Sequence, residues 1–374
     1  MAAAKRVCFL YIAQHHQVWH SLSVAVAMAR RWPAIKVEIA ATTPELIDYV
    51  ASLLAELGGA PIELVLLPPA WLRRLSSGAP PKAPMLIANA LRLARYDAVI
   101  TPERTTALLR RIGVRHPLLV YTQHGAGDRE GPFEPRLKVF DLVMAAGRKQ
   151  YDRMMGEGWV TEDTCAMVGY PKFDLVDELP QRDLPRFDKP GPVVLYNPHF
   201  HGELGSWPKW GKQVLDYFAT NDRYNLIFAP HIRLFETASM DERGAFKAFA
   251  ENPRIHVDLG GPAAADMTYT KAADLYLGDV SSQVYEFLRT PKPCLFLNSS
   301  GASWCGDPSF HHWLYGPVLE TIDNLSQGLD QAFATHEDYR EAQTWGIDET
   351  FDVSNTPASV RAARAIVDKL ERAA

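Results

Sequence analysis

The chain has 374 residues, 47% of them hydrophobic and 22% charged, which fits a folded protein with two domains of about 150 to 200 residues each. Its formal net charge of −5 comes without a concentration of Lys and Arg, so composition gives no reason to expect nucleic-acid binding. The four cysteines are widely spaced and form no CxxC pair, which excludes the usual zinc and disulfide patterns. We expect reduced thiols in a cytoplasmic protein.

Short apolar runs alternate with amphipathic stretches through the first half of the chain. Strands are predicted at 5–13, 36–42, 62–68, 97–102, 117–125 and 140–147, and helices at 19–33, 45–58, 84–96 and 104–113. This alternation predicts a parallel sheet covered by helices on both faces. No window approaches the ~20 apolar residues needed to span a bilayer, so we expect any membrane contact to be peripheral.

The alternation stops at 172–192, where prolines and alternating charges predict a linker, and then resumes. Strands are predicted at 193–200, 224–231, 255–260, 273–278 and 291–298, and helices at 210–220, 244–252, 281–290, 323–336 and 354–374. We therefore predict an α/β protein with two Rossmann-like, doubly wound parallel-sheet domains, 1–178 and 190–350, and a C-terminal helix, 355–374.

Polar side chains follow four of the predicted strands. These residues are His124 with Gly125 and Gly127, then His199 with His201, then His231 with Arg233, and finally Asp279 with Ser281 and Ser282. Doubly wound sheets bind ligands beyond the carboxyl ends of their strands, and clefts between domains are favoured sites. A lone loop histidine is commonly only solvated, and we keep that interpretation for the other histidines, including His15 and His16, although these two also follow a predicted strand.

The stretch 273–287, ADLYLGDVSSQVYEF, places two serines where a strand is followed by a predicted helix. A serine there can cap the helix, and the unpaired N–H groups of the first turn can also bind a phosphate. Asp279 can cap the turn, hold the loop or order a serine, and Glu286 can contact a ribose or face solvent. The glycines after His124 lack the GxGxxG spacing and the P-loop lysine, which argues against a nicotinamide enzyme and a P-loop ATPase.

Five stretches resemble the CDP-glycerol glycerophosphotransferase family in order and spacing. They are QHG at 123–125, VGYPKFD at 168–174, YNPHF at 196–200, APHIR at 229–233 and LGDVSSQVYEF at 277–287. The resemblance implies the two-domain GT-B fold. It also implies transfer of glycerol phosphate, or a similar polyol phosphate, from a CDP-activated donor to a hydroxyl of a glycan- or lipid-linked acceptor, with release of CMP.

The same resemblance implies roles for individual residues. His124 is implied to be the general base on the acceptor hydroxyl, and His231 the second catalytic histidine. The residues expected at the donor's phosphates and nucleotide are Ser281, Ser282, Asp279, Arg233, Gly278 and Glu286. Those expected on the acceptor side or in the cleft are Gly125, Gly127, His199, His201, Tyr170, His15 and His16.

The residues themselves suit this chemistry. Phosphoryl transfer depends on positioning and charge stabilisation, so we expect protonated His231, Arg233 and the serine-bearing helix end to neutralise the diphosphate. The chain has no Asp-x-Asp motif, so we expect no metal ion and no cofactor. It departs from the family in reading His-Gly-Ala-Gly at 124–127 and Pro-His at 230–231.

Three alternatives stay open: a GT-B glycosyltransferase using a UDP-sugar or a CMP-Kdo-like donor, an epimerase acting on a sugar nucleotide, and a non-catalytic partner that binds nucleotide sugars. The stretch 66–84, with Trp71, Leu72, Arg73, Arg74 and Lys82, is consistent with an interfacial patch at the inner face of the cell membrane. The alternative is a loop whose tryptophan packs inside the protein.

Overall fold

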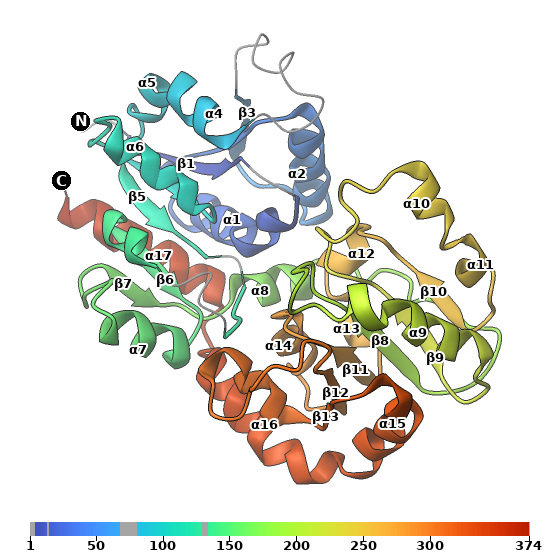
Figure 1. The fold of residues 1–374 in the computed structure, drawn as a ribbon. Coiled ribbons are helices and arrows are strands. Elements are labelled where there is room, and N and C mark those ends of the chain that lie inside the picture. Colours follow the sequence, from blue (N-terminus) through green and yellow to red (C-terminus); the bar gives the residue numbers. More distant parts are fainter. Residues whose placement is uncertain (1–3, 13–14, 68–80, 124, 129–133, 374) are drawn as a thin grey trace. The chain divides into compact units, whose positions relative to one another are not determined.

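The structure, a computed structural model, describes residues 4–12, 15–67, 81–123, 125–128 and 134–373 (Figure 1). The chain divides into two compact units. Unit 1 comprises 1–125, 131–180 and 348–374, and unit 2 comprises 126–130 and 181–347. Each unit contains one parallel sheet, with the strand orders given below, so the predicted pair of doubly wound α/β sheets is confirmed.

The sheet of unit 1 has seven strands in the order β3-β2-β1-β4-β5-β6-β7. The strands are β1 (Arg6–Tyr11), β2 (Lys36–Ala41), β3 (Ile62–Leu66), β4 (Ala98–Thr101), β5 (Leu118–Tyr121), β6 (Leu142–Ala145) and β7 (Cys165–Met167). The chain runs outward from β1 to β3 and then crosses to β4 on the other side of β1. The strand order therefore reverses between β1 and β4, the point where such sheets bind ligands.

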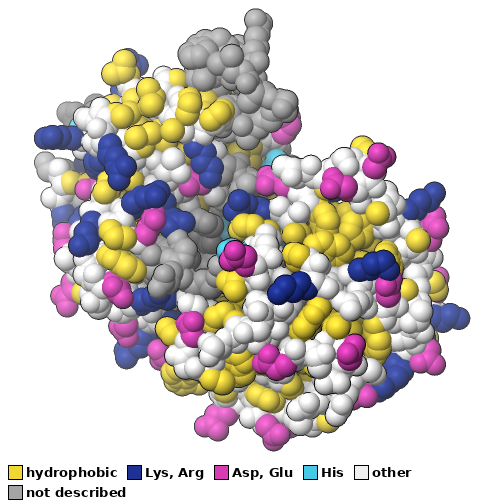
Figure 2. Space-filling view, viewed as in Figure 1, with side chains coloured by type: hydrophobic (Ala, Val, Ile, Leu, Met, Phe, Trp, Pro, Cys, Tyr) yellow, Lys and Arg dark blue, Asp and Glu magenta, His cyan; other side chains and the backbone are white. Residues whose placement is uncertain are grey.

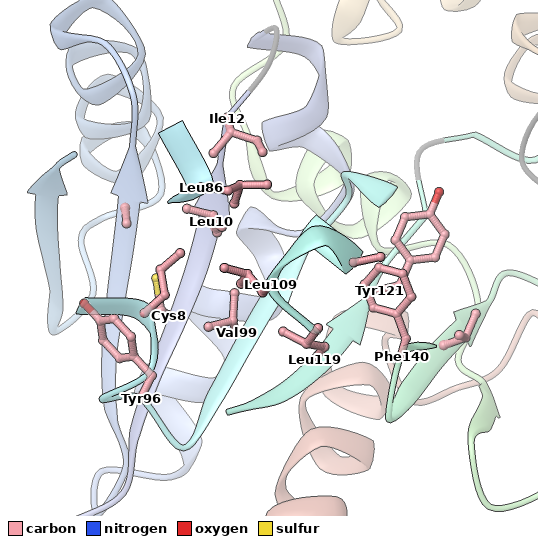
Figure 3. Packing of buried hydrophobic residues seen from close by; sticks show 14 of the residues in the cluster. Cys8, Leu10, Ile12, Leu86, Tyr96, Val99, Leu109, Leu119, Tyr121 and Phe140 are labelled. Atoms are coloured by element: carbon pink, nitrogen blue, oxygen red, sulfur yellow. The ribbon is translucent and has the colours of Figure 1, made fainter. Parts of the chain in front are cut away.

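Both faces of this sheet are covered. The helices are α1 (Leu22–Arg31), α2 (Pro44–Glu56), α4 (Lys82–Ala88), α5 (Ala90–Leu93), α6 (Leu108–Arg111), α7 (Arg148–Gly156), α8 (Pro171–Glu178) and α17 (Ala358–Arg372), with 3₁₀ turns η1 (His15–His20), η2 (Arg104–Ala107) and η3 (Pro135–Val139). Cys8, Leu10 and Ile12 pack with Leu86 of α4 and Leu109 of α6 in one hydrophobic cluster (Figure 3). The intervening residues of β1 are also fully buried, because the opposite face of a parallel sheet is covered as well.

The C-terminal helix α17 belongs to unit 1, where it packs against α1 and α8 (Figure 1). Its first turn is held by Asp174, whose carboxylate accepts a hydrogen bond from Ser359 N at 2.6 Å. Gly169 has a φ of +84°, and a Cβ there would lie 2.9 Å from the carbonyl oxygen of Asp352. The stretch 168–174 thus positions the returning end of the chain.

Unit 2 has six strands in the order β10-β9-β8-β11-β12-β13, with its reversal between β8 and β11. They are β8 (Val193–Asn197), β9 (Asn225–Phe228), β10 (Ile255–Val257), β11 (Leu275–Gly278), β12 (Cys294–Leu297) and β13 (Val318–Leu319). The helices are α9 (Trp207–Thr220), α10 (Met240–Gly244), α11 (Lys247–Ala250), α12 (Pro262–Ala265), α13 (Thr268–Ala272), α14 (Gln283–Phe287), α15 (Leu325–Ala334) and α16 (His336–Thr350), with η4 (Pro308–Tyr315) and η5 (Ile322–Asn324). Apolar side chains of α9 and α15 pack on one sheet face.

Two expectations differ from the structure. The first part of the predicted linker is helical, because Pro171 starts α8 and Leu175 and Val176 are buried against unit 1. Helix α14 has only five residues, where a run over 281–290 was expected. None of the helices that the structure describes is both long and apolar enough to cross a membrane.

A buried carboxylate ties the loops at the reversal point of unit 1. Glu103, directly after β4, is 8% exposed and accepts hydrogen bonds from Lys82 Nζ at 2.6 Å and Gln17 Nε2 at 3.2 Å. Thr105 Oγ1 donates to its other oxygen at 2.9 Å. Burial raises the pKa of this carboxyl, but the hydrogen bond and charge of Lys82, with Gln17 and Thr105, outweigh it and lower the pKa to about 2.

This geometry predicts acid sensitivity of unit 1. A depressed carboxyl pKa contributes stability that is present above its ordinary value of 4.5 and lost as pH falls toward 2. In urea denaturation, the free energy of unfolding of the wild type should therefore fall by about 2 kcal/mol more than that of Glu103→Gln between pH 5 and pH 3. The exposed Glu157→Gln should follow the wild type, and parallel curves for wild type and Glu103→Gln would contradict the assignment.

Candidate functional site

The carboxylate of Asp279 joins the two loops at the reversal point of unit 2. Asp279 follows β11 and is fully buried. From the loop after β8 it accepts hydrogen bonds from His199 N at 2.9 Å, Ser206 N at 2.6 Å and Ser206 Oγ at 2.8 Å. Val280 N donates to it at 2.6 Å. One side chain thus fixes the backbone on both sides of the position where doubly wound sheets bind ligands.

The role of Asp279 is therefore to hold the loops, one of the roles expected from the sequence. Burial raises the pKa of its carboxyl, and the hydrogen bonds from Ser206, Val280 and His199 oppose that rise. All of these partners donate, so the ionised carboxylate satisfies each of them.

Three histidines beside this carboxylate share one hydrogen-bond pattern. The Nδ1 atom of His199 accepts from His201 N at 3.2 Å, that of His201 from Leu204 N at 3.4 Å, and that of His231 from Arg233 N at 3.2 Å. An Nδ1 that accepts carries no proton, so each neutral ring has its proton on Nε2. With Nδ1 accepting from Arg233 N, His231 presents its Nε2–H group as a hydrogen-bond donor.

The aromatic ring of Phe200 lies among these groups. The His199 and His231 rings are 5.1 Å apart, and each contacts Phe200, with centroids separated by 4.3 and 4.7 Å. The Arg233 guanidinium lies over the same ring at 4.1 Å. His199, His201 and His231 are part-exposed and Arg233 is exposed, and these residues follow the carboxyl ends of β8 and β9.

The two serines after β11 have different environments. Ser281 is buried, and its hydroxyl accepts from Gln283 N at 3.3 Å, whereas Ser282 is exposed. The side chain of Ser282 makes no capping hydrogen bond to α14. A five-residue helix has a small dipole, so any ligand binding here depends on side chains and local N–H groups.

The neighbouring candidates have packing roles. Gly278 accommodates Tyr276, whose ring would lie 2.6 Å from a Cβ at that position. Glu286 is buried, so it does not face solvent. Gly127 belongs to unit 2, and a Cβ there would lie 2.9 Å from Ser282 Cβ. Glycine at position 127 therefore allows the chain to pass directly beside the exposed serine.

Two of the unit 1 candidates, Gly125 and Tyr170, line one small pocket, whereas His15 and His16 are not part of its lining. His124 lies outside the described residues, while Gly125 has a φ of +111°. His15 is exposed and packs edge-on against Tyr49 at 5.0 Å, and His16 is part-exposed in η1. Tyr170 is buried, 4.9 Å from the rings of Phe173 and of Phe351. Burial gives Tyr170 a packing role in unit 1.

The membrane patch expected at 66–84 falls mostly on 68–80, including Trp71 to Arg74, and these lie outside the described residues. Lys82 forms an ion pair with Glu103. On the face shown in Figure 2, charged side chains of both signs are interspersed over the described surface. Among the described residues, no group of three or more His, Cys, Asp or Glu is placed to hold a metal ion.

Sequence reasoning missed several buried polar residues: Glu103, Gln150, Asp128 and His312. Gln150 is fully buried and spans two loops, accepting from Ala146 N at 2.9 Å and donating to Gly125 O at 3.1 Å. Glu103 follows the predicted strand 97–102, so the strand-end pattern could have identified it. Gln150, Asp128 and His312 follow no predicted strand directly, and polar side chains at such positions are ordinarily solvated.

Comparisons with known proteins report on the fold. No protein-family model and no curated protein sequence matches the chain. Among solved structures, the wall teichoic acid polymerase TagF is 14% identical with a TM-score of 0.65, covering 100% of this chain and 90% of its own. A putative UDP-N-acetylglucosamine 2-epimerase from Listeria monocytogenes is 16% identical with a TM-score of 0.66, covering 100% and 98%.

A glycosyltransferase from Rickettsia africae also matches, at 12% identity and a TM-score of 0.54, over 99% of both chains. One of the similar structures is a TagF variant soaked with CDP-glycerol. Identities this low carry information on fold alone. The chain is similar along its length to these proteins, and its two Rossmann-like domains have the GT-B fold, as the sequence motifs implied.

Proposed function

We propose that this protein transfers glycerol phosphate, or a similar polyol phosphate, from a CDP-activated donor to a hydroxyl of a glycan- or lipid-linked acceptor, releasing CMP. The observation that carries the proposal is the group of donors at the carboxyl edge of the unit 2 sheet. It comprises the Nε2–H groups of His199, His201 and His231, the guanidinium of Arg233 and the hydroxyl of Ser282.

These donors suit a diphosphate. Phosphoryl oxygens only accept hydrogen bonds, and donors fixed before the reaction stabilise the charge that develops on those oxygens. Each histidine tautomer is fixed by a backbone N–H. The Nε2–H groups therefore need not reorganise when the nucleotide-activated substrate binds. The motif resemblance and the fold shared with TagF, a wall teichoic acid polymerase, favour CDP-glycerol as the first donor to test.

In the proposed reaction, the acceptor oxygen attacks the phosphorus that bears the glycerol. A new P–O bond forms, the bond from that phosphorus to the bridging oxygen breaks, and CMP leaves with the electron pair. We assign His124 as the base that accepts the hydroxyl proton, on the resemblance alone. The hydrogen-bond donors of unit 2 would stabilise the departing CMP.

A second candidate is a sugar-nucleotide epimerase, because the UDP-N-acetylglucosamine 2-epimerase structures match the chain as well as TagF does. The same donor group would bind the diphosphate of a UDP-sugar. The two candidates differ in the base recognised and in the product formed. If the acceptor is lipid-linked, we expect the transferase to act at the inner face of the cell membrane.

The proposal predicts that CMP release depends on the His231 side chain. With CDP-glycerol and a hydroxyl-bearing acceptor, CMP release measured by chromatography should fall about 10² to 10³-fold in His231→Ala, the loss expected for one preorganised donor. Calorimetry should show the purified wild type binding CDP-glycerol more tightly than UDP-N-acetylglucosamine or CMP-Kdo.

His336→Ala, a histidine of α16 outside this group, is the matched control and should keep wild-type turnover. Equal turnover in His231→Ala and the control would contradict the assigned site. If the protein binds and epimerises UDP-N-acetylglucosamine but does not bind CDP-glycerol, the second candidate replaces the transferase.

The contact of Gly127 with Ser282 gives a separate prediction. Gly127→Ala adds a methyl group where a Cβ meets Ser282 Cβ at 2.9 Å, so the serine must move. We expect affinity for CDP-glycerol to fall about tenfold, equivalent to about 1.4 kcal/mol. Gly202→Ala, where a Cβ meets nothing within 4 Å, should bind as the wild type does. Unchanged affinity in Gly127→Ala would remove Ser282 from the donor site.

A further inference from the structure

Asp128 is a buried acid in the segment that follows β5, and this segment packs within unit 2. Its carboxylate accepts hydrogen bonds from Tyr285 Oη at 2.6 and 2.7 Å and from His312 N at 3.1 Å. His312 Nδ1 lies 2.8 Å from the same carboxylate, and both side chains are at most 3% exposed. Residues distant in sequence thus share one buried polar network.

The His312 ring connects this carboxylate to the candidate site. Its Nε2 atom is 2.9 Å from the carbonyl oxygen of Asp279, which also accepts from Trp313 Nε1 at 2.7 Å. A carbonyl oxygen only accepts, so His312 Nε2 carries a proton. Nδ1 faces a carboxylate that already accepts from two other donors, which is the arrangement of a hydrogen-bonded pair in which Nδ1 also donates.

Asp279 is consequently held from two directions. Its carboxylate binds backbone N–H groups on the loop after β8, as described above, and its carbonyl oxygen is fixed by His312 and Trp313. Gly127, next to Asp128, lies against Ser282. The segment that carries Asp128 is therefore linked to both ends of the loop from Asp279 to Ser282. His312 connects Asp128 to Asp279, and Gly127 lies against Ser282.

An apolar core would not require this chain of polar groups. Burying a carboxylate and an imidazole has a desolvation cost that apolar side chains of similar size would avoid, so the network suggests a need for defined geometry. A hydrogen-bonded connection specifies the position of a carbonyl oxygen, whereas apolar packing is less directional.

We propose that Asp128 and His312 form a positioning relay that fixes the loop from Asp279 to Ser282 for binding the donor's phosphates. Asp128 orients the imidazole and His312 holds the Asp279 carbonyl; neither touches the substrate. The link to phosphate binding rests on the proposed function, whereas the effect on the loop does not.

The relay is tested first in the ligand-free protein by hydrogen–deuterium exchange. The amide nitrogen of Asn occupies the position of Nδ1, and that of Gln the position of Nε2. His312→Asn should therefore lose the contact with Asp279, and His312→Gln should keep it. We expect exchange in peptides covering 279–283 to rise at least tenfold in His312→Asn and Asp128→Ala, and to stay within about threefold of wild type in His312→Gln.

Tyr224→Phe is the matched structural control. It removes the hydrogen bond that Tyr224 Oη donates to Asp330 Oδ1 at 2.6 Å. Tyr224 precedes β9, so this bond lies away from the carboxyl edge of the sheet. It should lower the melting temperature without raising exchange at 279–283. Tyr285→Phe, which removes one donor to Asp128, gives a milder variant if Asp128→Ala does not fold. Exchange at 279–283 no higher in the relay variants than in the control would overturn the proposal.

Kinetics with CDP-glycerol provide the second test. His312→Asn should raise KM for CDP-glycerol about tenfold with kcat within about threefold of wild type, because positioning of the donor loop acts on binding. His312→Gln should restore KM, and Tyr224→Phe should leave both constants unchanged. If the wild type does not use CDP-glycerol, the proposed function fails, and the exchange measurement alone decides whether the relay exists.

Discussion

The geometry of the unit 2 site depends on one buried carboxylate. Asp279 lies where the strand order reverses, and its oxygens accept N–H and O–H groups from the loops after β8 and β11. Without it, the backbone N–H groups of His199 and Ser206 would lose a charged acceptor, at a cost of about 1 to 3 kcal/mol for each buried donor. The loop after β8, which carries His199 and His201, is therefore held by a buried acid.

The two units place an acid at equivalent positions. Glu103 follows β4 in unit 1, and Asp279 follows β11 in unit 2, and each of these strands lies beside the first strand of its sheet. Each carboxylate also binds a group that follows that first strand, Gln17 after β1 and His199 after β8. The environments differ, because Glu103 has the cation Lys82 beside it and Asp279 is met by neutral donors. This difference explains why the pKa is lowered in one unit and raised in the other.

The sequence was informative where side chains follow a strict local pattern. Alternating apolar runs predicted the parallel sheets, since both faces of such a sheet are buried. Strands β7 and β13 have three and two residues, too few to carry a period, and were not predicted. The strand ends identified His199, His201, His231 and Asp279, but not which atoms they present. That detail depends on backbone turns in which Nδ1 accepts the N–H of a residue two or three positions later.

The relay residues lay beyond sequence reasoning for a different reason. His312 follows no predicted strand, and Asp128 follows a glycine-rich turn where an acid is ordinarily solvated. Their burial results from the packing of 126–130 within unit 2, a contact between segments about 180 residues apart in the chain. A local pattern contains no information on such a pairing.

The fixed tautomers also constrain the chemistry that unit 2 can perform. A histidine whose Nδ1 accepts a backbone N–H can donate from Nε2, but it cannot take a second proton at Nδ1 without losing that bond. His199, His201 and His231 are therefore suited to bind oxygen atoms that only accept, as those of a diphosphate do. A proton acceptor for an attacking hydroxyl must come from another group, which agrees with the role that the motif resemblance gives to His124.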